Sequence, residues 1–160
     1  MRFMKHLFLL LLFLSCSFTG FCQNSMLKGK EARAVSMGME LDGSQTIQVV
    51  GVGKNRADAI EQAKKNAVWI VIFNGVHEGK GSYTRPLLNQ ANAHEVHESF
   101  FNAFFKDGGE YRDYVSMKDS KRSSIKRVKT ENGYECTVIV RVLRSELKDM
   151  LEKKFQLKLK

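Results

Sequence analysis

A strict alternation of apolar side chains near the C-terminal end constrains the fold of this chain most. Tyr134, Cys136, Val138, Val140 and Val142 occupy every second position, and side chains two apart on a strand share one face of a sheet. A strand-like run at residues 123–130 precedes them, and Glu-Asn-Gly joins the two runs, a strong signal for a β-hairpin. We therefore expect an antiparallel sheet with one buried face.

An earlier strand is followed by a helix with alanine at every fourth position. Residues 46–52 are rich in β-branched side chains and run into a Gly-Val-Gly turn at 51–53. The next segment carries Ala59, Ala63 and Ala67, and such a stripe of small residues lets a helix lie close upon a sheet. This helix is expected to continue through the apolar residues 68–73 and to stop at Asn74 and Gly75.

The remaining segments complete the expected order of elements. Residues 76–90 are expected to form a loop and residues 91–105 a second helix, with Val96, Phe100, Ala103 and Phe104 as its apolar face. Residues 111–117 are strand-like. Ser145 is expected to cap a closing helix whose inner face carries Leu147, Met150 and Leu151.

The order β-α-α-β-β-β-α predicts an α+β fold, with an antiparallel sheet of three to four strands and helices packed on one face. Residues 45–160 are expected to form a single domain. Residues 23–44 are expected to be a flexible N-terminal lead-in, with a short edge strand at 35–41. A length of 160 residues, 43% hydrophobic content and one Pro exclude a multidomain, collagen-like or largely disordered chain.

The first 22 residues have the pattern of a secretory signal peptide. Arg2 and Lys5 precede eight unbroken apolar residues at 7–14, which is too short for a membrane span of about 20 residues. Small residues at 20 and 22 favour cleavage before Gln23 and release of a soluble chain. Residues 13–16 alternatively resemble a bacterial lipobox, with Phe13 where Leu is usual, and would leave a lipidated Cys16. Both alternatives predict export to the periplasm or the outer membrane.

Removal of this signal changes the charge and the cysteine count of the chain. The formal charge falls from +9 to +7, and 138 residues remain. Cys136 is then the single cysteine, so no internal disulfide is expected. Its place on the apolar face of a strand predicts a buried structural thiol rather than a nucleophile.

The glycine-rich turn at 51–54 does not match a phosphate-binding motif. A dinucleotide fingerprint needs a third Gly where Arg56 stands. A P-loop needs a Gly at Gln48 and a Ser or Thr at Asn55. We expect the glycines to serve a tight turn, and we expect no cofactor and no catalytic residue, because no Ser-His-Asp order or carboxylate pair stands out.

His94, His97 and Glu98 are weak candidates for metal ligands. Their spacing allows one shared helix face, with His77 as a distant fourth ligand, but zincin histidines lie four apart rather than three. A solvated helix face explains the same residues without a metal, which is the interpretation that we prefer.

Basic residues gather in the segment before and within the hairpin. They are Lys118, Lys121, Arg122, Lys126, Arg127 and Lys129. No aromatic residues are interleaved with them, so we do not expect nucleic-acid binding. Lysines on an edge strand also discourage aggregation, but an acidic envelope protein or surface is the partner that this charge would attract.

The segment 47–53, with Ala59, Ile60, Ala63 and Ala67 after it, resembles the opening of a bacterial envelope family. It is similar to small outer-membrane lipoproteins and to the N-terminal domain of the flagellar protein FlgT, which begin with a strand ending in Gly-x-Gly or Gly-x-Ala and an alanine-rich helix. The resemblance spans at most residues 46–142. It implies a non-enzymatic role in envelope assembly and transfers no catalytic residue.

These observations together predict an exported, non-catalytic protein that docks onto an envelope complex or acidic surface as an assembly or structural component. The alternative is a periplasmic ligand-binding or metal-dependent enzymatic domain that uses the loop and helix at 75–98. The loop at 75–89 is the expected functional surface in that case, because long loops on a rigid scaffold often carry binding.

Overall fold

The computed structural model describes residues 33–80, 83–117 and 125–156. The expected signal peptide with Cys16 and residues 23–32 of the expected lead-in lie outside the described residues. So do three residues of the basic segment, Lys118, Lys121 and Arg122.

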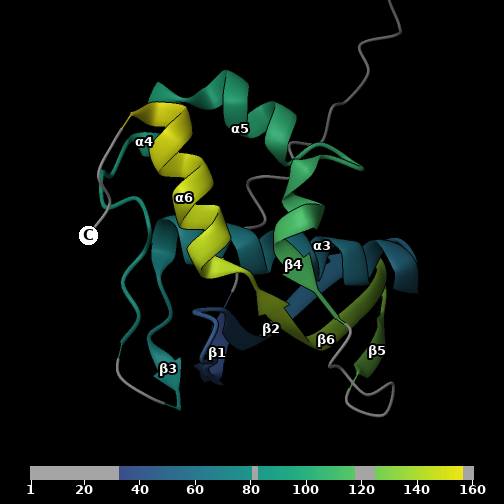
Figure 1. Cartoon of the computed structure of the whole chain (residues 1–160). Helices are drawn as coiled ribbons and strands as arrows, with labels where there is room; N and C mark the ends of the chain where they lie inside the picture. Colours follow the sequence, from purple (N-terminus) through teal and green to yellow (C-terminus); the bar gives the residue numbers. More distant parts are fainter. Residues whose placement is uncertain (1–32, 81–82, 118–124, 157–160) are drawn as a thin grey trace, which may run out of the picture.

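The described residues form a mixed α+β fold, as the sequence predicts (Figure 1). The strands are β1 (Ala34–Met39), β2 (Gln45–Gly53), β3 (Glu78–Gly79), β4 (Val115–Ser116), β5 (Lys126–Thr130) and β6 (Gly133–Val142). The α-helices are α3 (Arg56–Trp69), α4 (Ala93–Val96), α5 (Glu98–Phe104) and α6 (Arg144–Phe155). A π-helix η1 (Ile70–Asn74) extends α3, and a 3-10 helix η2 (Glu110–Tyr114) precedes β4.

The sheet is larger than predicted. Its order is β3-β1-β2-β6-β4, with β5 also paired to β6, so the described chain contains six strands rather than three or four. The pairs are antiparallel except for β1 with β3, which run parallel. The strand expected at 35–41 is β1, which pairs with β2 and so joins part of the lead-in to the sheet. It is not at the edge as predicted, because the short strand β3 pairs with its other side.

The long β2–β6 pair forms the centre of this sheet. Its register runs from Gln45 opposite Val142 to Gly53 opposite Tyr134. Alternate residues of both strands are buried, including Ile47 and Val140, which face each other across the pair. The predicted period-two pattern of β6 is thus confirmed. Figure 1 shows α3 across the sheet, and all four helices on its upper side.

Helix α3 lies so close to β2 that the strand needs glycine at the contact. A Cβ on Gly51 would stand 2.2 Å from the carbonyl oxygen of Ala59 and 2.3 Å from the amide nitrogen of Ala63. Ala59, Ala63 and Ala67 are fully buried. The expected stripe of small residues is confirmed, and the Gly-Val-Gly segment serves helix packing.

The end of α3 is joined to the loop that follows it. The backbone amides of Leu87 and Leu88 donate to the carbonyls of Val71 at 3.0 Å and Ile72 at 2.8 Å. These are carbonyls that a helix end otherwise leaves unpaired. The segment around Leu87 and Leu88 therefore returns across the end of the helix and is bonded to its backbone.

The prediction of one continuous second helix over residues 91–105 is wrong. The helix is broken at His97 into α4 and α5, so residues before and after the break do not share one face. Phe101 and Phe104 are buried, whereas Val96 is 60% exposed. The apolar face expected from an unbroken helix is therefore only partly correct.

Two further predictions are corrected near the C-terminal end. Residues 110–114 form the 3-10 helix η2, which leaves only Val115–Ser116 of the predicted 111–117 strand. Ser145 does not cap α6: its hydroxyl donates to the carbonyl of Gly43 at 3.3 Å, and the residue at the N-cap is Leu143. The inward positions of Leu147 and Leu151 are confirmed, because both are fully buried.

Among the described helices, none combines the length and the apolar composition that crossing a bilayer requires.

Candidate functional site

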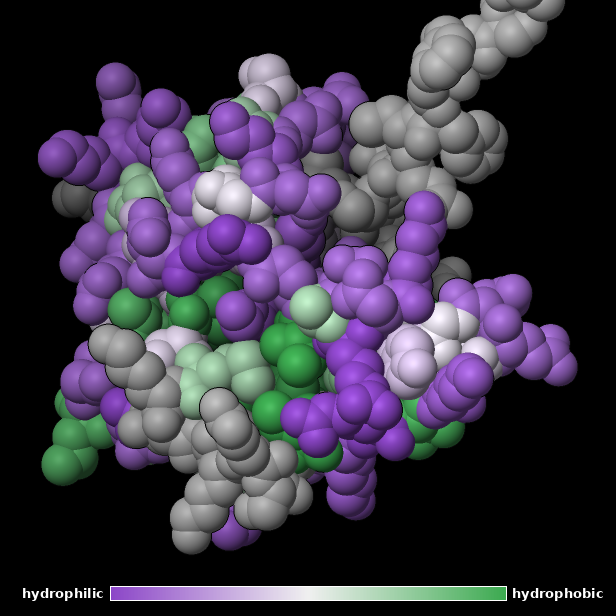
Figure 2. Space-filling view, turned by 90° about the vertical axis from the view of Figure 1, so that its right-hand side faces the viewer, coloured by the Kyte–Doolittle hydropathy of each residue, from purple (hydrophilic) through white to green (hydrophobic). Residues whose placement is uncertain are grey.

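The described basic residues lie on β5, at one edge of the sheet. Lys126, Arg127 and Lys129 are exposed, like the whole of this strand. Its register with β6 places Lys126 opposite Thr137, and Arg127 and Lys129 opposite Cys136 and Tyr134. Lys126 therefore points to one face of the sheet, and Arg127 and Lys129 point to the other. Figure 2 views the side of the molecule on which β5 lies and shows a mostly hydrophilic surface, with hydrophobic groups gathered in its middle.

The surroundings of these three cations differ from those of the ion-paired cations in the described part of the chain. Elsewhere in the described chain, carboxylates pair with Lys64, Lys65, Arg112, Arg141 and Lys148. None of the ion pairs between described residues involves Lys126, Arg127 or Lys129. Their charge is therefore not neutralised by a direct contact within this part of the protein.

The candidate metal ligands lie in separate environments. The His94 ring lies among aromatic rings, with centroid distances of 5.0 Å to Trp69 and 6.0 Å to Phe101. The His97 ring stacks on Phe155 at 3.8 Å, and Glu98 is exposed. Within residues 33–80, 83–117 and 125–156, no three His, Cys, Asp or Glu side chains come together as metal ligands would.

A cavity of about 620 Å³ lies where η1, the 83–91 segment and α4 meet. Its apolar and aromatic walls include Trp69, Phe73, Tyr83, Pro86 and Leu88. Its polar side chains are Asn74, Arg85, Asn89, Gln90, His94 and Glu95. This volume and mixture are typical of small-molecule sites. Part of its lining lies in the 75–98 region, where the alternative interpretation of the sequence places a ligand site.

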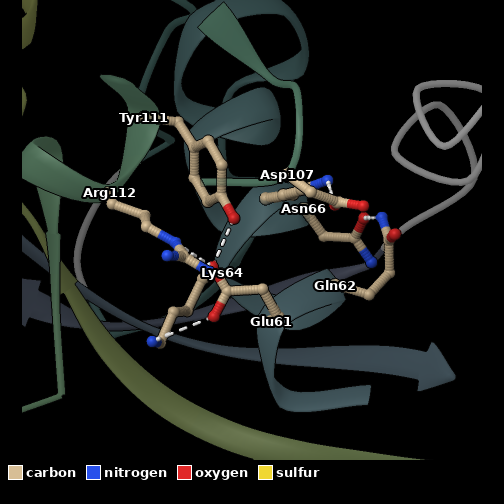
Figure 3. A network of polar contacts seen from close by, with 8 residues as sticks. Glu61, Gln62, Lys64, Asn66, Asp107, Tyr111 and Arg112 are labelled. Atoms are coloured by element: carbon tan, nitrogen blue, oxygen red, sulfur yellow. Dashed lines mark hydrogen bonds and ion pairs between the residues drawn. The ribbon is translucent and has the colours of Figure 1, made fainter. Parts of the chain in front are cut away.

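A polar network joins α3 to η2 on another part of the molecule (Figure 3). The carboxylate of Glu61 accepts hydrogen bonds from the Tyr111 hydroxyl and from Arg112 Nε, the latter at 2.6 Å, and pairs with Lys64 at 3.3 Å. Burial tends to raise the pKa of Glu61, but the hydrogen bonds from Tyr111 and Arg112 outweigh it and hold the pKa below its usual value.

The same network changes the acidity of Tyr111. Burial and the adjacent Glu61 carboxylate raise the pKa of its hydroxyl well above the ordinary value. Next to it, Lys65 pairs with Asp107 at 2.6 Å, and Asn66 donates to the carbonyl of Val50 at 2.8 Å. Apart from the Lys64–Glu61 pair, which lies within α3, these polar groups make contacts between elements and hold α3 against η2, β2 and the segment before η2.

The glycine turn lies beside a cavity of about 510 Å³ next to this network. Charges of both signs line the cavity, and its Lys65, Glu61 and Arg112 are already paired. Gly53 has a packing role, because a Cβ there would stand 2.4 Å from the amide nitrogen of Ala59. The expected tight turn at these glycines is corrected: residues 51–53 belong to strand β2, and Gly51 and Gly53 allow the close approach of α3.

Cys136 is fully buried on the face of β6 that α3 covers, and its thiol lies 3.9 Å from the carbonyl oxygen of Arg56. The structural thiol predicted from the alternation of β6 is therefore confirmed in its placement.

Two features have no counterpart in the sequence analysis. One is the contact of Glu61 with Tyr111 and Arg112, which joins residues about 50 positions apart. The other is the convergence of Trp69, Arg85 and Glu95 on one cavity. No short-range pattern could have indicated either feature.

No protein-family model matches this chain, and comparisons with curated proteins and with solved structures found no significant match.

Proposed function

We propose that this chain is an exported, non-catalytic envelope protein that docks onto an acidic partner through strand β5, as an assembly or structural component. The observation that carries the proposal is the exposure of Lys126, Arg127 and Lys129 on an edge strand, without a carboxylate partner among the described residues.

Physical chemistry supports a role in recognition for this edge. A cluster of unpaired cations attracts acidic surfaces and steers their approach. Among the described strands β5 pairs only with β6, and an edge strand keeps backbone groups that an extended partner segment can bind. The similarity of residues 47–67 to small envelope lipoproteins, together with the signal-like residues 1–22, supports placing the partner in the envelope.

The charge contribution can be tested with a matched pair of triple variants. One carries Lys126→Gln, Arg127→Gln and Lys129→Gln, and the other carries Lys148→Gln, Lys153→Gln and Lys154→Gln on α6. Both remove three positive charges, so a difference between them reports on position. We expect the β5 variant alone to lose capture of material from envelope extract at low salt, where charge attraction is strongest.

Anionic vesicles assayed beside the extract separate a lipid surface from a protein partner. Equal losses in the two variants, or capture by the native chain that is insensitive to salt, would refute docking through β5. Mass spectrometry of the exported chain tests the premise of export: we expect a mature N-terminus at Gln23, or a lipidated Cys16 under the alternative. A chain that retains residues 1–22 would contradict both.

A further inference from the structure

The cavity beside Trp69 carries two opposite charges that do not pair with each other. Arg85 and Glu95 are both exposed and both line the cavity. The ion pairs of the described residues include none between them. Because each side chain faces the same space without meeting the other, each can bind an opposite charge of a ligand placed between them.

A second guanidinium contacts the backbone next to the cavity. Arg144 Nη2 donates to the backbone carbonyl of Arg85 at 2.8 Å. Its Nη1 is buried and meets no acceptor within the described residues, and no carboxylate there pairs with it. Burial lowers the pKa of this guanidinium. Arg144 is not among the residues that line the cavity, so Arg85 is the guanidinium that a bound carboxylate would meet.

The walls between the charges suit an apolar side chain and a peptide group. Phe73, Pro86 and Leu88 contribute apolar surface, whereas Asn74, Asn89 and Gln90 contribute amides that can donate to or accept from a backbone. Trp69 is 3% exposed, and its indole N–H is buried without an acceptor among the described residues. Such a donor is normally paired in a folded protein.

We propose that this cavity binds a short peptide with free termini and an apolar side chain, of about the size of a dipeptide. Its carboxylate lies at Arg85, its ammonium lies at Glu95, and its side chain packs on the aromatic wall. A dipeptide extends over about 7 Å of chain, and the cavity of about 620 Å³ has room for it. The site does not depend on β5, so it stands independently of docking.

The chain contains its own reporter, because Trp69 is its single tryptophan. The dipeptide Ala-Phe is titrated into the full chain while Trp69 fluorescence and the one indole N–H signal in an NMR spectrum are followed. We expect a saturable change in both. The capped peptide, acetylated at its N-terminus and amidated at its C-terminus, is expected to bind on the order of tenfold more weakly or worse.

Three variants locate the binding. Arg85→Gln and Glu95→Gln are each expected to raise the Kd about tenfold or more, since each removes one charge-assisted bond from an exposed position. Arg127→Gln on β5 is the matched control and should leave the Kd unchanged. The proposal is overturned by no saturable change up to about 10 mM peptide, by equal binding of the capped peptide, or by equal effects of Arg85→Gln and Arg127→Gln.

Discussion

Replacing Gly51 by alanine tests the contact between α3 and β2 with a single added methyl group. The new Cβ would lie 2.2 Å from the Ala59 carbonyl oxygen, whereas an ordinary contact is 3.4–4 Å. Both nearest neighbours, the Ala59 oxygen and the Ala63 nitrogen, are backbone atoms. No rotamer change can relieve the overlap, so α3 must move away from β2 by about 1 Å. A gap of this size loses a quarter to a half of the van der Waals energy of each atomic contact along the interface.

The expected loss of stability follows from these distances. Overpacking of a core typically costs about 1–3 kcal/mol, and a collision with backbone belongs at the upper end of this range. Alanine also lowers the conformational entropy of the unfolded chain, which stabilises the folded protein by about 0.4–1 kcal/mol and offsets part of this cost. We therefore expect Gly51→Ala to lower the free energy of unfolding by about 2–3 kcal/mol and the Tm by about 8–12 °C for a domain of this size.

The assay is thermal and urea unfolding followed by circular dichroism, with Val52→Ile as the matched control. Val52 is 42% exposed on the opposite face of the same strand, so the added carbon there should change the free energy of unfolding by no more than about 0.5 kcal/mol. If Gly51→Ala unfolds at the same temperature as Val52→Ile, the close contact between α3 and β2 at Gly51 is refuted.

Two further predictions concern buried groups. Because hydrogen bonds hold the pKa of Glu61 below its usual value, the charged carboxylate stabilises the fold above the pKa of the unfolded chain, and this contribution is lost as the pH falls through the folded pKa. The free energy of unfolding should fall as the pH is lowered from about 5 to about 3. In Glu61→Gln the free energy of unfolding should depend less on pH over this range. An unchanged pH dependence in Glu61→Gln would contradict the network. Cys136 is fully buried. In a chain that carries Cys16→Ser and Cys22→Ser, its thiol should therefore not react with a thiol reagent until urea unfolds the protein. Rapid reaction of the folded chain would show that this face of β6 is not covered.

The parts of the fold that the sequence predicts are those set by neighbouring residues. The alternation of β6, the β5–β6 hairpin and the alanine spacing of α3 are indicated by short-range patterns, and the structure contains all three. The turn of the hairpin consists of Glu131 and Asn132, because Gly133 already pairs with Thr130. Each pattern requires only that one face be buried, so it indicates the element before its packing partner is known.

The elements that were predicted wrongly depend on distant residues. The aromatic residues of 111–117 favour a strand, but Tyr111 turns into a 3-10 helix, where its hydroxyl reaches Glu61 on α3. The break at His97 accompanies stacking of its ring on Phe155 of α6, 58 positions later. The Arg85–Glu95 cavity likewise exists only once η1 and α4 have come together. Such contacts are set by tertiary packing, which overrides local propensity.

The hydrogen bonds from Leu87 and Leu88 to the end of α3 couple the cavity to the sheet energetically. The 83–91 segment cannot detach without freeing the carbonyls of Val71 and Ile72, which continue the helix seated on β2. Opening of the cavity wall and unfolding of the sheet should therefore belong to one cooperative unit in hydrogen exchange. A molecule bound in the cavity would then raise the melting temperature of the whole domain by mass action, instead of merely ordering a loop.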